Sequence, residues 1–233
     1  MARRLEGSRV GHAFRERPEL QAALLFFVVA SLLLVFAVLG EEITEGETMK
    51  FDRSLANTLR ALGAGAAWTA EAARDLTSLG STAVLGLITG VAVLYLLLLK
   101  DRIGSAVVFS TVFGGQILSS SLKAWFDRAR PDLLPLPPNL SASFPSGHSM
   151  MSAVTYLTIA MLLTRTQPAR SIRIFSVAVA VLMIVVVGLS RVYLGYHWPT
   201  DVLGGWCLGS AWALLFGGFI MRMARKYGAK VRA

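Results

Sequence analysis

Charged residues are scarce in this sequence, and their scarcity excludes most soluble folds. Only 16% of the 233 residues are Asp, Glu, Lys or Arg, whereas soluble domains carry about a quarter. Hydrophobic residues make up 55% and fall in long runs. Runs of about 18 or more apolar residues are long enough to cross a bilayer. The composition therefore predicts a polytopic membrane protein.

Cysteine and acidic residues are also few. The single Cys207 lies in an apolar run and cannot form a disulfide within the chain, so we interpret it as a small packing residue. Asp and Glu number 14 against 23 Lys and Arg, and the net charge is +9. A basic stripe can indicate nucleic-acid binding, but most of these cations lie at the ends of apolar runs, as the positive-inside rule describes. We expect the membrane, and no nucleic acid, as the partner.

Six apolar segments are long enough to be membrane helices, and they lack the strict alternation of barrel strands. The expected spans are 21–40, 82–99, 103–122, 149–164, 172–190 and 202–221. The first exceeds the apolar core of a typical cleaved signal peptide, so we expect it to be retained. The predicted fold class is all-α, a bundle of six transmembrane helices. It forms one domain, 21–221, between basic segments at 1–20 and 222–233.

Two pairs of glycines recur at four-residue spacing within the predicted spans. Gly86 pairs with Gly90, and Gly205 pairs with Gly209. Such pairs allow membrane helices to approach closely. We expect both pairs at helix contacts of a compact bundle. Neither pair identifies a dimer interface, and the sequence predicts no obligate protein partner.

The distribution of basic residues predicts the orientation. With six spans, 15 of the 23 Lys and Arg residues fall on the side of both termini, so both termini are expected in the cytoplasm. Three connections, 41–81, 123–148 and 191–201, are then extracytoplasmic. The first becomes amphipathic from Phe51 to Trp68, which predicts a short interfacial helix. The second contains five of the eight prolines, which predicts a stiff extended loop.

Four of the basic residues on the outer side cluster at span ends: Lys123, Arg128, Arg130 and Arg191. Any one of them could simply reach into lipid headgroups. Together they could form an anion site, because guanidinium forks bind phosphate oxygens in pairs and Lys acts as a point charge. The charge of such a site suits a phosphomonoester or a diphosphate.

The segment 145–148, Pro-Ser-Gly-His, immediately precedes an apolar span. Its backbone amides should lie at a helix N-terminus, which attracts anions. Gly147 would permit close approach of a phosphate, and the hydroxyl of Ser146 could donate another hydrogen bond. A Ser-Gly pair in this place is also an ordinary helix cap. Beside His148 and the cluster of cations, the anion-binding interpretation gains weight.

His197 and Asp201 are four residues apart, with Pro199 between them. Proline is tolerated in the first turn of a helix, so both side chains can share a face. A carboxylate on one imidazole nitrogen fixes the tautomer and leaves the other nitrogen free to attack phosphorus. The same pair could instead ligate a metal, but a metal needs further ligands and the cations nearby would repel it. We therefore expect no metal and no cofactor.

Three motifs now stand in order along the chain: KxxxxxxRP at 123–131, PSGH at 145–148 and SRxxxxxHxxxD at 190–201. Together they resemble the signature of the type-2 phosphatidic acid phosphatase superfamily, which includes bacterial membrane lipid phosphatases and vanadium haloperoxidases. Each motif lies at an extracytoplasmic span end according to the charge distribution. The six-span layout extends the resemblance to most of the chain.

The resemblance implies a two-step hydrolysis with histidine as the nucleophile. His197 would attack phosphorus while Asp201 orients it, and His148 would protonate the leaving oxygen and then activate water. The phosphate oxygens would be held by Lys123, Arg130, Ser146, Gly147 and Arg191. His197 would have to be neutral and His148 charged, which predicts a bell-shaped pH dependence. Arg128 lies outside the core positions of the signature, and we assign it to headgroup contact.

The resemblance also implies the substrate class and the location. We expect a lipid phosphate or diphosphate in a bacterial inner membrane, with the site facing the periplasm. Undecaprenyl diphosphate comes first, followed by phosphatidylglycerol phosphate, phosphatidic acid and lipid A phosphate. A phosphotransferase passing through the same intermediate remains open. A transporter is disfavoured because the sequence has no internal repeat and its charges lie at span ends, and a haloperoxidase because those relatives are soluble.

Overall fold

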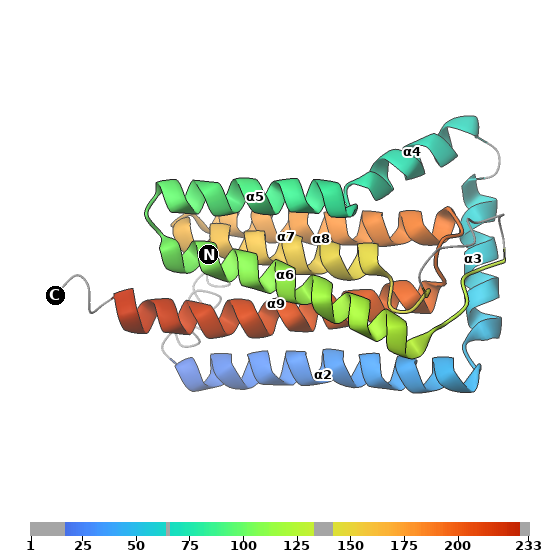
Figure 1. Cartoon of the computed structure of the whole chain (residues 1–233), viewed down its shortest axis with the longest axis horizontal. Coiled ribbons are helices and arrows are strands. Elements are labelled where there is room, and N and C mark those ends of the chain that lie inside the picture. The colour runs from blue at the N-terminus through green and yellow to red at the C-terminus, as the bar shows by residue number, and fades with distance from the viewer. Residues whose placement is uncertain (1–16, 64–65, 133–141, 229–233) are drawn as a thin grey trace, which may run out of the picture.

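The computed structural model of the chain is a bundle of helices that run up and down, with one helix crossing an end of the bundle (Figure 1). The structure describes residues 17–63, 66–132 and 142–228. Within those ranges it contains eight helices and no strand. The helices are α2 (Pro18–Glu45), α3 (Met49–Gly63), α4 (Ala67–Ser78), α5 (Thr82–Leu98), α6 (Arg102–Phe126), α7 (Gly147–Thr166), α8 (Arg170–Tyr193) and α9 (Pro199–Gly228).

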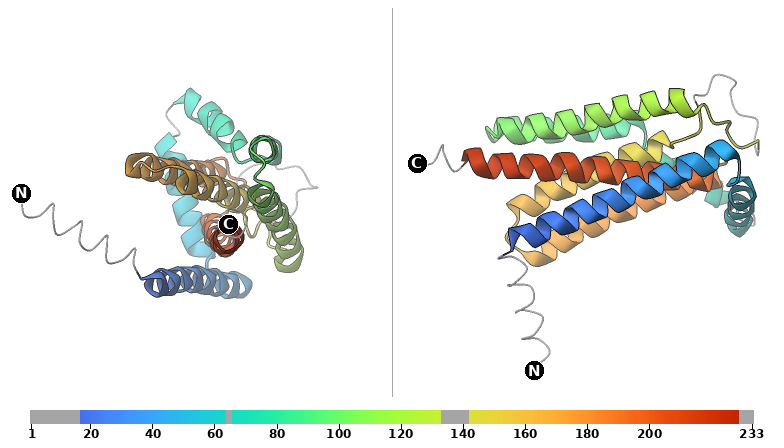
Figure 2. Two further views of the ribbon diagram at one scale, coloured as in Figure 1. Left: turned by 90° about the vertical axis from the view of Figure 1, so that its left-hand side faces the viewer. Right: turned by 90° about the horizontal axis from the view of Figure 1, so that it is seen from below.

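The six predicted spans fall on the six helices α2 and α5 to α9, which lie roughly along one direction in all views (Figures 1 and 2). In the described part of the chain, α2, α6 and α8 are long and apolar enough to cross a membrane. The pair α4 and α5, bent by 41°, would make a fourth span if it counts as one. Helix α7 does not qualify on composition, because its buried face carries the polar residues Ser152, Thr155 and Thr158. The predicted all-helical bundle is confirmed, with three or four candidate spans.

The two glycine pairs have different surroundings. A Cβ atom on Gly209 would stand 2.4 Å from the carbonyl oxygen of Met150, and one on Gly205 would stand 2.8 Å from that of Ser146. These two glycines therefore let α9 approach the backbone of α7, as predicted. Gly86 and Gly90 have no atom within 4 Å of such a Cβ. The prediction of a helix contact was wrong for this pair, because these glycines border an open groove.

The connection after α2 differs from the prediction. Helix α2 continues to Glu45, and two helices follow where one was predicted between Phe51 and Trp68. Helix α3 crosses the end of the bundle (Figure 1). It packs through Ala56 against Val192 and Val202, so this amphipathic helix covers the ends of α8 and α9.

The second connection begins later than predicted, because α6 continues to Phe126. The stiff extended loop was predicted for the connection 123–148, of which residues 133–141 lie outside the described residues. Residues 1–16 and 229–233 of the two basic segments also lie outside them. The returning segment is anchored by Phe144, which is fully buried. Its ring stacks on Phe36 with centroids 5.4 Å apart and meets Phe126 edge-on at 4.7 Å. This packing fixes the approach to the N-terminus of α7.

Candidate active site

Four helix ends meet at the end of the bundle that α3 crosses (Figure 1). They are the C-terminal ends of α6 and α8 and the N-terminal ends of α7 and α9. The residues predicted from the three motifs all lie here, on or beside these ends: Lys123, Arg130, Ser146, Gly147, His148, Arg191, His197 and Asp201. Segments up to 78 residues apart along the chain are thereby gathered in one place.

The segment before α7 is held by its backbone on two sides. The amide of Ser143 donates to the carbonyl of Arg128 at 2.8 Å, and the amide of Ser146 donates to the carbonyl of Asp201 at 3.0 Å. The hydroxyl of Ser146 accepts hydrogen bonds from the amide and the hydroxyl of Ser149, at 3.5 and 3.0 Å. Ser146 thus acts as the N-cap of α7 in this structure, which was the simpler of the two interpretations.

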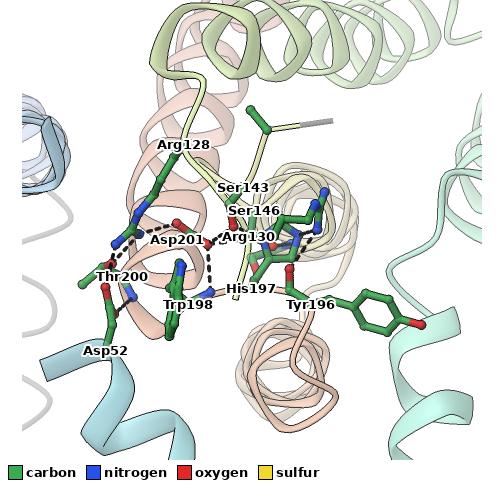
Figure 3. Close-up of polar contacts among 12 residues, drawn as sticks. Asp52, Arg128, Arg130, Ser143, Ser146, Tyr196, His197, Trp198, Thr200 and Asp201 are labelled. Carbon is green, nitrogen blue, oxygen red and sulfur yellow. Dashed lines mark hydrogen bonds and ion pairs between the residues drawn. The ribbon is translucent and has the colours of Figure 1, made fainter. Parts of the chain in front are cut away.

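His197 and Asp201 form a buried pair (Figure 3). Nδ1 of His197 lies 3.4 Å from Oδ2 of Asp201, and the two side chains are 2% and 0% exposed. The same carboxylate oxygen accepts a hydrogen bond from the backbone amide of Trp198 at 2.8 Å and another from the hydroxyl of Ser143. Ser143 could not be predicted from the sequence, because a single serine in a proline-rich connection belongs to no recognisable pattern.

The other imidazole nitrogen of His197 faces a guanidinium. Nη1 of Arg130 lies 3.3 Å from Nε2 of His197 and also donates to the carbonyl of Tyr196 at 2.8 Å. Because a guanidinium can only donate, Nε2 carries the lone pair and Nδ1 carries the proton toward Asp201. Burial lowers the pKa of His197 to about 3, with the hydrogen bond to Asp201 acting in the opposite direction. The imidazole is therefore neutral at neutral pH, as a nucleophile requires.

Three cations surround the second histidine. His148 precedes the predicted span 149–164, in the first turn of α7. Burial and the charges of Arg191, Lys123 and Arg130 lower its pKa to about 4. Among these cations the low pKa favours the neutral form of His148, whereas the sequence predicts the charged form during catalysis. A phosphate dianion among the same cations would offset their charge and raise the pKa of His148 again.

A cavity of about 450 Å³ opens beside these residues. Lys123, Gly147 and His148 line it, together with Ser119, Gln116 and Met151. A Cβ atom on Gly147 would stand 3.4 Å from Cε of Lys123, so the glycine keeps the space beside the Lys123 ammonium open. Nζ of Lys123 donates to the carbonyl of Ala142 at 2.7 Å. The cavity is thus built to admit a small anion beside a lysine and a histidine.

Arg191 is held at the end of α8 by two neighbours. Its guanidinium lies 4.3 Å from the ring centroid of Tyr196 and donates to the hydroxyl of Thr77 at 3.3 Å. The residue is 8% exposed. These two contacts restrain the guanidinium at the end of α8.

Arg128 does not reach into headgroups, contrary to the prediction. Its side chain is 8% exposed, and it forms ion pairs with Asp52 and Asp201. Sequence reasoning missed Asp52 altogether, because an aspartate on the polar face of an amphipathic helix is the ordinary pattern of a solvated surface. Among the described residues, no three His, Cys, Asp or Glu side chains form a group that could hold a metal ion.

Known proteins resemble the chain over the region that carries this site. The family model described as the PAP2 superfamily matches residues 104–225. Phosphatidylglycerophosphatase B of Bacillus subtilis (strain 168) is 35% identical over 199 residues, which cover 84% of this chain and 96% of that protein. An undecaprenyl-diphosphatase of Sulfolobus acidocaldarius is 38% identical over 85 residues, which cover 36% of this chain and 37% of that protein.

A solved structure agrees with the fold as well. The crystal structure of a transmembrane PAP2-type phosphatidylglycerolphosphate phosphatase from Bacillus subtilis superposes with a TM-score of 0.76 at 32% sequence identity. The match covers 84% of this chain and 97% of that one. With the long apolar helices, this similarity identifies a membrane protein. The chain belongs to the PAP2 superfamily.

Proposed function

We propose that the protein removes phosphate from a membrane lipid phosphate or diphosphate, without a metal ion, through a phosphohistidine at His197. One observation carries the proposal. The cavity beside Lys123 and His148 continues into an apolar groove, so a single molecule with an anionic head and an apolar tail fits both. A lipid phosphate has this combination of groups.

The groove has a volume of about 420 Å³ and lies between α5, α6 and α7. It shares Thr82, Gln116 and Met151 with the cationic cavity. Beyond them its walls are almost entirely apolar and include Leu85, Gly86, Gly90, Val93, Phe109 and Phe113. The open space beside the two glycines widens the groove at its centre. A lipid tail in this groove would leave the headgroup beside Lys123 and His148.

The arrangement supports attack by Nε2 of His197. Asp201 holds the proton on Nδ1, so the Nε2 lone pair can form a P–N bond as the P–O bond to the lipid breaks. Arg130, which lies 3.3 Å from Nε2, is placed to bind a phosphate oxygen as the nucleophile approaches. Lys123 and Arg191 would stabilise the charge that develops on the other oxygens.

His148 would manage the protons in both steps. It gives a proton to the leaving oxygen of the lipid in the first step, and it takes a proton from water in the second. Water then cleaves the P–N bond, which releases inorganic phosphate and restores the neutral His197. The basic surroundings of both histidines supply the positive charge that a metal ion provides in other phosphatases.

We further propose that all six long helices cross the membrane of a bacterial cell, with the site on the extracytoplasmic side. Helix α2 begins and α9 ends at the end of the bundle opposite to α3 (Figure 1), and 15 of the 23 basic residues belong to that end or to the chain ends beyond it. The positive-inside rule then places both termini in the cytoplasm.

Two lipids are the leading candidate substrates, and the first experiment should distinguish between them. The sequence led us to expect undecaprenyl diphosphate, and one relative of that name covers 36% of the chain. The similarity to a phosphatidylglycerophosphatase covers 84% of the chain and supports phosphatidylglycerol phosphate. Phosphatidic acid and lipid A phosphate complete the panel, because they present the same anionic head at the end of an apolar tail.

The test is phosphate release from this panel by the purified protein in excess EDTA, with His197→Ala beside the wild type. We expect turnover without metal in the wild type and a loss of roughly 10³-fold or more in the variant. Loss of wild-type activity in EDTA would contradict the metal-free mechanism. A phosphorylated lipid product in place of free phosphate would identify a phosphotransferase instead.

A further inference from the structure

A buried network of charged side chains joins Asp52 on α3 to His197 (Figure 3). It runs through Arg128, which stands at an unspecified position of the first motif, and Asp201. Nη2 of Arg128 lies 2.7 Å from Oδ2 of Asp52, and Nη1 lies 2.5 Å from Oδ1 of Asp201. The Arg128 side chain is 8% exposed, and both carboxylates are fully buried. One guanidinium therefore bridges two carboxylates that lie far apart along the chain.

The side chains of Thr48 and Thr200 and the backbone amide of Thr200 extend this network of charged side chains. Oδ1 of Asp52 accepts the backbone amide of Thr200 at 3.0 Å, and Oδ2 accepts the hydroxyl of Thr200 at 2.7 Å. Arg128 also donates to the hydroxyls of Thr200 and Thr48, at 2.8 and 3.0 Å. Asp52 thus fixes both Arg128 and the first turn of α9, where Asp201 lies.

The two oxygens of Asp201 have separate partners. Oδ2 faces Nδ1 of His197 and accepts from Ser143 and from the amide of Trp198. Oδ1 is held by Arg128. Arg128 therefore sets the plane of the carboxylate from behind, and the carboxylate in turn sets the plane and the tautomer of the imidazole.

Stability alone is a weak reason for this arrangement. Removing three charges from water costs free energy that their mutual attraction often fails to recover, so well-packed apolar groups can be at least as stable. Orientation of a reacting group is a stronger reason, because small displacements of a nucleophile cost large factors in rate.

We propose that Arg128 is a positioning residue for His197 and that Asp52 anchors it from α3. Asp52 lies outside residues 104–225, which match the family model, so a helix outside that region would set the geometry of the nucleophile. The inference rests on the proposed function of His197 and adds two residues that do not touch the substrate.

The first test compares kcat and KM of Arg128→Gln, Arg128→Lys and Asp52→Asn on one lipid phosphate. We expect Arg128→Gln to lower kcat by about 10²-fold with KM within about twofold of wild type. Arg128→Lys keeps the charge but cannot bridge both carboxylates in a fork, and Asp52→Asn keeps the shape of the anchor. We expect each of these two to lose roughly 10-fold in kcat.

Lys50→Gln is the matched control. Lys50 lies on α3 two residues before Asp52 and is exposed. Exposed substitutions of this kind change little, so kcat should stay within about twofold of wild type. An equal loss in Lys50→Gln would mean that any disturbance of α3 lowers kcat, and the positioning role would be overturned.

The double variant Asp52→Asn/Arg128→Gln tests whether Asp52 affects kcat through Arg128 or independently of it. If Asp52 acts through Arg128, the kcat of the double variant should equal that of Arg128→Gln. If the two losses multiply, Asp52 acts by another route and its role as the anchor is refuted. Thermal unfolding of each variant shows that a fall in kcat belongs to folded protein.

A second measurement, of the His197 tautomer, needs no substrate. It therefore tests the positioning role even if the proposed function is wrong. The chain has three histidines, and nitrogen NMR of histidine-labelled protein, with His197→Ala for assignment, reports the tautomer of His197. We expect the Nδ1–H form in the wild type and a mixture in Arg128→Gln. An unchanged tautomer together with an unchanged kcat would overturn the inference. Inactive wild type with the tautomer change would instead overturn only the proposed function.

Discussion

His148 and His197 lie in one cluster of cations, yet the proposed mechanism requires different protonation of the two side chains. Burial lowers the pKa of His197 to about 3, and this favours a nucleophile that stays neutral. The low pKa of His148, about 4, is caused by burial and then by three cations. In the proposed mechanism a bound phosphate would offset the charge of those cations, and His148 would then acquire the proton for the leaving oxygen as the substrate binds.

The dependence of the His148 pKa on bound phosphate predicts how kcat changes with pH. As the proposed acid, His148 must be protonated, so activity is present below its pKa and is lost as the pH rises through that pKa. Because kcat reports the enzyme–substrate complex, the loss on the alkaline side should occur well above pH 4. His148→Ala should lower kcat by about 10²- to 10⁴-fold and remove that alkaline loss. Initial rates at saturating substrate across the neutral range measure both effects, and an unchanged alkaline limb in the variant would contradict the role of His148.

The motif residues were accessible to sequence reasoning because their spacing is local. His197 and Asp201 are four residues apart, and a helical turn is enough to bring them together. The partner of Arg128 is 76 residues away, and nothing in the local pattern of Asp52 marks it as buried. The low pKa of His148 could not be read from the sequence for a related reason, since it depends on burial and on three cations from α6, the following connection and α8.

The helices α5, α6 and α7 form the groove that we assign to the lipid tail. Its width depends on Gly86 and Gly90, whose missing side chains leave open space. In the sequence these glycines have the same spacing as Gly205 and Gly209, which lie at a close helix contact. Spacing alone could not distinguish the two situations, because each glycine's role depends on what the opposite helix presents.

Filling the groove should affect substrates according to their tails. Gly86→Leu places a side chain in the open space without touching the cations, so we expect a roughly 10-fold or greater rise in KM for a long-chain lipid phosphate. The rate with a short-chain, soluble phosphomonoester should stay within about twofold. Val91→Leu is the control, because Val91 is on the same helix, 61% exposed and outside the groove.

Equal losses for long and short substrates in Gly86→Leu would place the damage in the headgroup site and contradict a tail groove. Loss of activity in Val91→Leu would indicate that α5 tolerates no added bulk. Comparison of KM for two chain lengths across the three proteins therefore decides whether the groove selects for a tail.

The bundle as a whole shows how far hydropathy can describe a membrane enzyme. All six helices were found from apolar runs, yet by length and composition only three or four qualify as spans in the described chain. Helix α7 fails because its hydroxyl side chains lie against its neighbours inside the bundle. Polar residues in this position lower the mean hydropathy of a helix, although their side chains face other helices and not lipid. The number of spans therefore depends on helix packing as well as on hydropathy.

The six-span topology can be tested because the chain has one cysteine. In a Cys207→Ser background, single cysteines replace Ser54 on α3 and Ser171 at the start of α8, both exposed. Of the helices between these positions, α5, α6 and α7 are the ones that we propose cross the membrane. If all three cross the membrane, an impermeant maleimide added to intact cells or spheroplasts should label position 54 and spare position 171, and both should react after lysis.

If α7 stays out of the membrane while α5 and α6 cross, both positions lie on one side and label alike. The reverse pattern would place the histidines in the cytoplasm and refute the orientation derived from the basic residues.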